Sequence, residues 1–405
     1  MDDPAAAEIT SPASTIGEFS WPVEIEVGTD DWQRTKTFPF PHLQLTAPPN
    51  PDDLSTEECR LLFHICTLSK RLELTQSARF TTWAHKMPDF VTLATRHDYA
   101  MQSLVALSAT HLASTCKSAA LDQIAIAHRG NAFRSLSEAV GALVQENSDA
   151  VLAASAQLCW QSPGWQAWAA LMQGIKSLHA TLQGWKAQSR FPEFLGDNFY
   201  ELGIIPAYRS EVPGHEGLAL LEGSILSLER AMTFAADNEE QVRSLRQLLD
   251  FVQNLRISPP GPNPQDQFKV LHPLRAWIVW LPISFLDVTD RNLQTMTTLA
   301  HFYAVTLAVQ LHLPSPGPAY YPKMRMEAIE SLAGEINDLK QTVDPEGIDN
   351  AIELMRFPCE IAAHFRDRLQ TAEQVHGTRD VRAGGTMSMT DSLTLAATID
   401  FEGST

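Results

Sequence analysis

Apolar residues recur at helical spacing along most of the chain. Leu61, Ile65, Leu68 and Leu72 follow one another at steps of four, three and four. This period places them on one face of an α-helix. Similar stripes continue to about residue 365, and nowhere do strand patterns alternate with helical ones, as a parallel sheet would require. We therefore predict an all-α fold of many helices.

Capping residues and prolines predict where several helices begin. Ser55 or Thr56 can cap the first long helix, whose first turn is acidic. Asp149 is placed to cap a later helix, and further helices are expected at about 217–235 and 239–256. The remaining start signals are Ser162-Pro163 and Asp344-Pro345. The helical part of the chain therefore begins near residue 57.

Three regions differ in composition. Residues 1–56 form an acidic, Pro-rich arm that we expect to be partly extended, with a short strand at Val23–Val27, where apolar and acidic residues alternate. Residues 57–370 are predicted to form the helical domain. Residues 371–405 are rich in Gly, Ser and Thr and are expected to be a flexible tail.

The charge of the chain argues against direct contact with nucleic acid. The formal net charge is −18, and residues 1–58 contain twelve Asp or Glu against two basic residues, Arg34 and Lys36. The longest basic cluster is the pair Lys70-Arg71, whereas binding to the phosphate backbone requires several cations on one face. No apolar run approaches the roughly 18 residues of a membrane span, and the acidic N-terminus does not resemble a secretory signal. We expect neither nucleic acid nor a membrane among the direct partners.

The sequence offers no motif for metal, cofactor or nucleophilic chemistry. Its five cysteines, at positions 59, 66, 116, 159 and 359, lack the close pairs of a zinc site and suit a reducing compartment. A phosphate-binding Gly-rich loop and a nucleophile elbow are both missing. Arg96-His97-Asp98 has the composition of a catalytic triplet but fits a helix start better. We predict no cofactor, no metal and no catalytic residue.

Two histidines and a group of aromatic residues are the candidates for ligand binding. His111 and His301 each lie in an apolar helical segment, where a histidine is either a hydrogen-bonded core residue or a group that faces a cavity. Aromatic residues concentrated in one stretch either form core or line an apolar pocket. The predicted ligand-binding set is His111, Trp168, Trp277, Trp280, Phe285, His301, Phe302 and Tyr303.

Four segments, in this order, carry a resemblance to a known family. They are Leu104–Ala113 (LVALSATHLA), Glu146–Val151 (ENSDAV), Gly174–Lys176 (GIK), and the late pair Arg275–Phe285 and Leu299–Val305 (LAHFYAV). Together they resemble the fungal-specific regulatory domain that follows the zinc cluster in sterol-uptake-type transcription factors. The resemblance covers about residues 57–365.

The resemblance implies a helical regulatory domain connected with transcription, with an apolar ligand cavity in the sterol-sensing members. That family normally carries six cysteines in a short basic cluster, and this sequence contains no such cluster. The DNA recognition of the family therefore does not carry over. What it implies here is a regulator that acts in the nucleus through a zinc-cluster factor or a co-activator.

Three hypotheses about function follow. The first is a transcriptional regulator without its own zinc cluster, controlling a secondary-metabolite pathway through protein partners and a small apolar ligand. The second is a cyclase-like enzyme of secondary metabolism that reuses a helical apolar cavity, since such chemistry needs shape and few polar groups. The third is a passive interaction scaffold or a decaying fragment of a regulator. The first is our prediction, so we expect no enzyme activity; a homodimer is left open.

Overall fold

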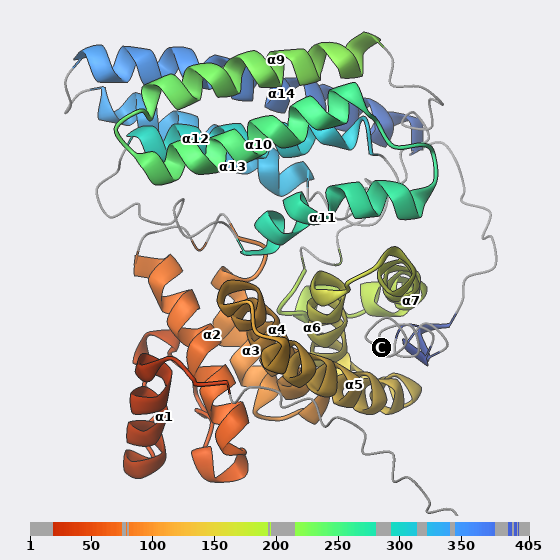
Figure 1. The fold of residues 1–405 in the computed structure, drawn as a ribbon. Helices are drawn as coiled ribbons and strands as arrows, with labels where there is room; N and C mark the ends of the chain where they lie inside the picture. The colour runs from red at the N-terminus through yellow and green to blue at the C-terminus, as the bar shows by residue number, and fades with distance from the viewer. Residues whose placement is uncertain are drawn as a thin grey trace, which may run out of the picture.

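The computed structural model describes residues 19–74, 78, 81–192, 195, 215–280, 293–313, 322–340, 345–376, 388–390, 393–394 and 396. Every long element among them is an α-helix, which confirms the predicted all-α fold. The helices form two bundles, an N-terminal one from α1 to α7 and a C-terminal one from α9 to α14, with α11 between them (Figure 1). In the described part of the chain, no helix is both long and apolar enough to cross a membrane.

In its described residues, the N-terminal bundle contains seven α-helices and four short 3-10 turns. The helices are α1 (Val23–Thr35), α2 (Thr56–Leu74), α3 (Met87–Ala94), α4 (Asp98–Cys116), α5 (Ala119–Gly141), α6 (Gln145–Gln161) and α7 (Trp165–Gln183). The turns are η1 (Pro41–Leu43), η2 (Pro51–Asp53), η4 (Ala84–Lys86) and η5 (Lys186–Gln188). The helix start expected at Ser55 or Thr56 is confirmed, because α2 begins at Thr56 with Ser55 before it.

The C-terminal bundle is built from long antiparallel helices. They are α9 (His215–Phe234), α10 (Glu239–Ile257), α12 (Leu293–Gln310), α13 (Pro322–Leu339) and α14 (Pro345–His376). The helix between the bundles is α11 (Pro264–Trp280). The expected helices at about 217–235 and 239–256 are confirmed as α9 and α10.

Each bundle surrounds one helix that is buried on all sides. In the N-terminal bundle this is α4, which contacts α2, α3, α5 and α6. In the C-terminal bundle it is α12, which contacts α9, α10, α13 and α14 and is buried from Thr295 to Gln310. The small residues Ala106, Ser108 and Ala109 of α4 let its neighbours approach closely. Each central helix contains one of the segments that carry the family resemblance.

Helix α11 connects the bundles by reciprocal capping of helix ends. The buried indole of Trp83 donates from Nε1 to the carbonyl oxygen of Val279, in the last turn of α11, at 2.8 Å. In return Arg275 of α11 donates to the carbonyl oxygens of Cys159 and Ser162, at 3.1 Å for Ser162, where α6 ends. The last carbonyls of a helix lack partners within it, so the N-terminal bundle and α11 each supply donors to a helix end of the other.

The strand expected at Val23–Val27 is a helix instead. Val23–Val27 forms the first turns of α1, because Ile25, Thr29 and Trp32, at helical spacing, are the buried residues of this segment. Val23 and Val27 are 74% and 63% exposed. The alternation of apolar and acidic residues did not indicate a strand here, because Val23 and Val27 do not belong to the core.

The end of the chain also differs from the expected flexible tail in its described residues. Helix α14 continues to His376, past the predicted boundary at residue 370. Further on, Met389, Leu393 and Ala396 are helical and buried among the residues of the hydrophobic core. Their spacing of four and three is that of one helix face.

Candidate functional site

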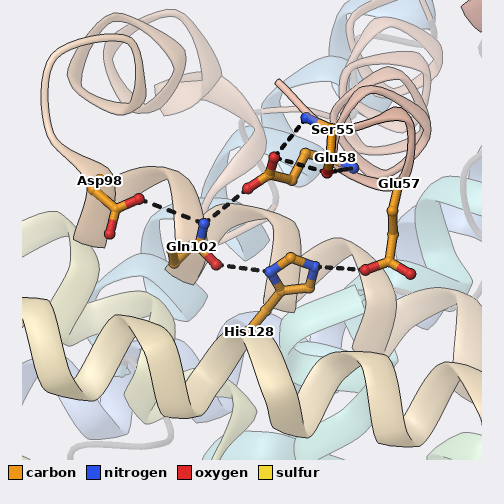
Figure 2. Close-up of polar contacts among 6 residues, drawn as sticks. All are labelled: Ser55, Glu57, Glu58, Asp98, Gln102 and His128. Carbon is orange, nitrogen blue, oxygen red and sulfur yellow. Dashed lines mark hydrogen bonds and ion pairs between the residues drawn. The ribbon is translucent and has the colours of Figure 1, made fainter. Parts of the chain in front are cut away.

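A network of polar side chains, with Gln102 and His128 buried at its centre, joins three helices of the N-terminal bundle (Figure 2). Its centre is Gln102 of α4, which donates from Nε2 to Glu58 at 2.8 Å and to Asp98 at 3.5 Å. On its other side, Gln102 Oε1 lies 2.7 Å from Nδ1 of His128 on α5. The second ring nitrogen of His128 lies 3.1 Å from Glu57 Oε1. The network thus connects the start of α2 with α4 and α5.

The orientation of the central amide follows from its partners. Carboxylates accept hydrogen bonds, so the amide nitrogen of Gln102 has to face Glu58 and Asp98, and its oxygen faces the ring. Nδ1 of His128 is therefore the donor to Gln102, which fixes the proton on that nitrogen. Gln102 and His128 are each 7% exposed, so both depend on these partners for their hydrogen bonds.

Glu58 belongs both to this network and to the cap of α2. Ser55 Oγ accepts from the Glu58 amide at 3.2 Å, and Glu58 Oε2 accepts from the Ser55 amide at 2.8 Å, which makes a reciprocal capping box. Burial alone would raise the pKa of Glu58, but the hydrogen bonds from Ser55 and Gln102 outweigh it and hold the pKa below its usual value. The carboxylate therefore stays ionised, and the network fixes how α2 packs on α4.

We expect Gln102→Leu to destabilise the N-terminal bundle by about 1–2 kcal/mol, because Glu58 and His128 each lose a buried partner. The measurement is the free energy of urea unfolding, with His128→Leu and the double variant completing a thermodynamic cycle. Since the two residues share one hydrogen bond, the double variant should cost less than the sum of the single ones. Additive costs would show that the bond contributes nothing to stability.

His111, the first predicted ligand-binding histidine, pairs with another histidine. Its Nδ1 lies 2.9 Å from Nε2 of His64 on α2. Burial lowers the pKa of His111 to about 4 and that of His64 to about 3. Both rings are therefore neutral at pH 7, and one donates to the other. The structure places His111 at the contact of α2 with α4, in a different bundle from Phe302 and Tyr303.

His301, the second predicted ligand-binding histidine, connects two helices of the C-terminal bundle. Its Nδ1 lies 2.7 Å from the carbonyl oxygen of Thr297, which can only accept, so Nδ1 carries the proton. Its Nε2 lies 2.8 Å from Ser227 Oγ on α9, whose hydroxyl donates to it. Burial lowers the pKa of His301 to about 4. Both histidines thus have the hydrogen-bonded core environment that was one of the two interpretations of the sequence.

The shifted pKa of His301 predicts a loss of stability in acid. The unfolded chain takes up the proton near pH 6.5, whereas the folded chain resists it down to about pH 4, so stability falls within this window as the pH is lowered. For His301 alone we expect a loss of about 2 kcal/mol between pH 6.5 and 5. His301→Gln should flatten the pH dependence of urea unfolding by this amount, and its effect at about pH 8 separates out the lost hydrogen bond. An unchanged slope would contradict the prediction.

The aromatic candidates occupy two places along α11. Trp168 of α7 contacts Phe268 of α11 with ring centroids 5.5 Å apart, at the junction of the bundles. Trp277, nearer the end of α11, contacts Phe302 at 6.1 Å, and Phe302 contacts Tyr303 at 5.4 Å. The side chain of Trp280 and all of Phe285 lie outside the described residues. The structure therefore brings Trp277, Phe302 and Tyr303 together and leaves Trp168 and His111 apart from them.

Two buried arginines stand beside these aromatic groups, and sequence reasoning did not single them out. Arg275 lies with its guanidinium carbon 4.1 Å from the centroid of Phe268. Arg325 of α13 is fully buried, 4.9 Å from the centroid of Tyr303, whose pKa is raised by burial. Nothing in the spacing of single arginines marks them as buried; only the packing of α11 and α13 does.

The family-like segment Glu146–Val151 has a structural role in part. Asn147 caps α6, since its Oδ1 accepts from the Val144 amide at 2.9 Å, and its Nδ2 donates to carbonyls at the end of α5. Asp149 was expected to cap this helix but lies inside it. It accepts hydrogen bonds from Ser189 Oγ and the Arg190 amide instead, at 2.6 and 2.9 Å. The described residues contain no group of three or more side chains suited to a metal ion.

The sequence matches known proteins over part of its length. Residues 85–254 match the family model described as the fungal specific transcription factor domain, from η4 through α10. The sterol uptake control protein 2 of Candida albicans is 27% identical over 232 residues, which cover 50% of this chain. The aligned part is 32% of that protein, so the chain spans about a third of its length. No solved structure matches this chain.

The family match includes the central helix α4, the cap of α6 at Asn147 and the first two helices of the C-terminal bundle. The matched range contains in full three of the segments on which the resemblance was based, Leu104–Ala113, Glu146–Val151 and Gly174–Lys176. Residues 85–254 of this chain are therefore similar to the fungal specific transcription factor domain.

Proposed function

We propose that this chain is a transcriptional regulator that works in the nucleus through protein partners, either a zinc-cluster factor or a co-activator. The observation that carries the proposal is the family match over residues 85–254. It is supported by the net charge of −18, which disfavours contact with DNA, and by the absence of a six-cysteine cluster from these 405 residues. The target genes are those of a secondary-metabolite pathway, as in the zinc-less regulators that the sequence resembles.

We also propose that the chain binds a small apolar ligand beside the end of α11. The named relative controls sterol uptake, and in this chain Trp277 and Phe302 contact each other where α11 meets the central helix α12. Aromatic side chains supply the apolar surface that such ligands need. Because α11 also caps α6 through Arg275, a ligand at this place would act on the connection between the bundles.

Transcription is tested by tethering. The 405 residues, fused to a heterologous DNA-binding domain, should change the output of a reporter gene in a fungal host, whereas the DNA-binding domain alone should not. Deletion of the gene should alter the transcripts of a group of biosynthetic genes. An inactive fusion together with unchanged transcripts would overturn the regulator, and turnover of a pathway intermediate by the purified chain would favour the enzyme.

Ligand binding is tested separately with ergosterol as the probe. Ergosterol should raise the melting temperature of the purified chain, since a ligand that binds the folded state alone stabilises it. Trp277→Ala should reduce this shift, while Trp21→Ala, at a partly buried tryptophan before α1, should leave it unchanged. If native mass spectrometry finds neither ergosterol nor a co-purified apolar molecule on the chain, the ligand proposal fails and the tethering result stands by itself.

A further inference from the structure

The outward face of α9 exposes apolar side chains to solvent. Helix α9 lies at the edge of the C-terminal bundle that points away from the N-terminal bundle (Figure 1). On this face Leu218 and Leu226 are 41% and 60% exposed. Helix α10 ends beside it, because Arg256 Nη1 lies 3.8 Å from Glu222 Oε1, and the next residue, Ile257, is 75% exposed. The two leucines and Ile257 are therefore the apolar part of one exposed surface.

Five exposed residues of α9 form a stripe that is symmetric about its middle. The α9 stripe consists of Ala219, Glu222, Leu226, Arg230 and Thr233. A helix turns by about 100° per residue, so all five lie within about 40° of Leu226 around the helix axis. Four residues before and after Leu226 stand a carboxylate and a guanidinium, and seven residues before and after it stand two small side chains.

This symmetry makes the stripe complementary to itself. When a second copy is turned about a two-fold axis through Leu226, its helix runs antiparallel, and residues equally far before and after Leu226 face each other. Glu222 of one copy then lies opposite Arg230 of the second copy, twice in the dimer. Ala219 and Thr233 face each other in the same way, and their small size lets the two helices approach closely. Parallel helices would instead bring Glu222 against Glu222, so charge selects the antiparallel arrangement.

The charges of this surface are balanced, although the chain as a whole carries −18. Arg230 forms no ion pair with a carboxylate in the described part of the chain. Glu222 pairs with Arg256, but 61% of its side chain is exposed, so its carboxylate can accept a second cation. Glu229, the remaining exposed charge on the described part of α9, lies about 60° from Leu226, on the side opposite to Arg230. Two copies can therefore meet here without the repulsion that the acidic rest of the surface would cause.

We propose that two copies of this chain associate through the α9 stripe, as antiparallel helices about a two-fold axis at Leu226. The two leucines cover each other at the axis, and two pairs of Glu222 with Arg230 flank them. One helix pair is small beside the roughly 1,600 Å² that stable complexes bury, so we expect a dissociation constant of about 10–100 µM. The dimer does not depend on a role in transcription. It leaves both N-terminal bundles accessible to other partners, because α9 faces away from them (Figure 1).

Sedimentation velocity of the purified full chain should show the change from monomer to dimer between about 1 and 200 µM. Leu226→Glu should weaken association about tenfold or more, because it places two carboxylates at the axis. Glu222→Arg and Arg230→Glu should each weaken it as well, since like charges then oppose each other. When these two single variants are mixed, opposite charges face each other again at both positions. The mixture should therefore associate within about threefold of the unaltered chain.

The matched control is Arg134→Glu on α5, which makes the same charge change as Arg230→Glu at an exposed arginine of the N-terminal bundle. It should leave the dissociation constant within about twofold of that of the unaltered chain. Circular dichroism and urea unfolding establish that each variant is folded. A chain that stays monomeric at about 200 µM would overturn the proposal. So would a dimer that Leu226→Glu leaves intact, equal weakening by Arg134→Glu, or a mixture that associates no more tightly than its components. None of these results changes the outcome of tethering.

Discussion

Trp83→Ala should destabilise the protein by about 3–5 kcal/mol, the cost typical of removing a large buried aromatic side chain. Trp83 is fully buried, and its indole caps the end of α11 from the other bundle. The variant thus leaves a cavity in the N-terminal bundle and a carbonyl oxygen of Val279 without its donor. We expect urea unfolding to separate into two steps, because the direct connection through α11 is weakened while the bundles keep their own cores.

The two contributions of Trp83 can be measured apart. Trp83→Phe keeps most of the volume and loses the hydrogen bond to Val279, so it should cost about 1–3 kcal/mol. Trp32→Ala is the control within one bundle. Trp32 is as buried as Trp83, but it lies on α1 and packs against Phe38. Hydrogen exchange of the α11 amides should accelerate in both Trp83 variants and stay unchanged in Trp32→Ala. Faster exchange in Trp32→Ala would show that α11 follows global stability and not this cap.

The helices were predictable from sequence because burial follows the same period in each of them. The stripe at Val242, Leu245, Leu248, Val252 and Leu255 becomes the buried face of α10, apart from Val242, which is half-buried. The segments of α4 and α12 were also expected to be helical, from apolar residues at helical spacing such as Met101, Leu104 and Leu107. That both helices are buried on all sides was not predicted, because their polar residues are buried as well. The division into two bundles was not predicted, because it depends on contacts between residues as distant as Trp83 and Val279.

Only part of the polar network around Gln102 could be predicted from the sequence. Ser55 and Glu58 have the spacing of a capping box, and an acidic first turn was expected there. Gln102 and His128, by contrast, stand alone in apolar surroundings, and nothing local indicates that they meet. Long-range pairs of this kind are set by how helices pack, and a single sequence without homologous ones carries no signal for them. The same reason explains why His111 was expected near the aromatic residues and lies beside His64 instead.

Gly28→Val should destabilise the N-terminal bundle by about 3 kcal/mol, through overpacking at the contact of α1 with α2. A Cβ atom at residue 28 would lie 2.1, 2.5 and 2.8 Å from three ring atoms of Phe63. The ring of Phe63 packs against Phe40 and is 9% exposed, so it can give way only by leaving its contacts or by pushing α1 outward. Urea unfolding measures the loss, and limited proteolysis should cut near α1 first.

The control for Gly28→Val is Gly334→Val on α13. Both glycines lie inside helices, so the change in helix propensity is the same, but a Cβ at residue 334 would meet no atom within 4 Å. This variant should therefore be neutral or gain a few tenths of a kcal/mol, because valine has the higher helix propensity of the two. Phe63→Ala should relieve part of the cost of Gly28→Val, since the clash disappears with the ring. If the two valine variants have equal stability, the close approach of α1 to Phe63 does not exist in solution.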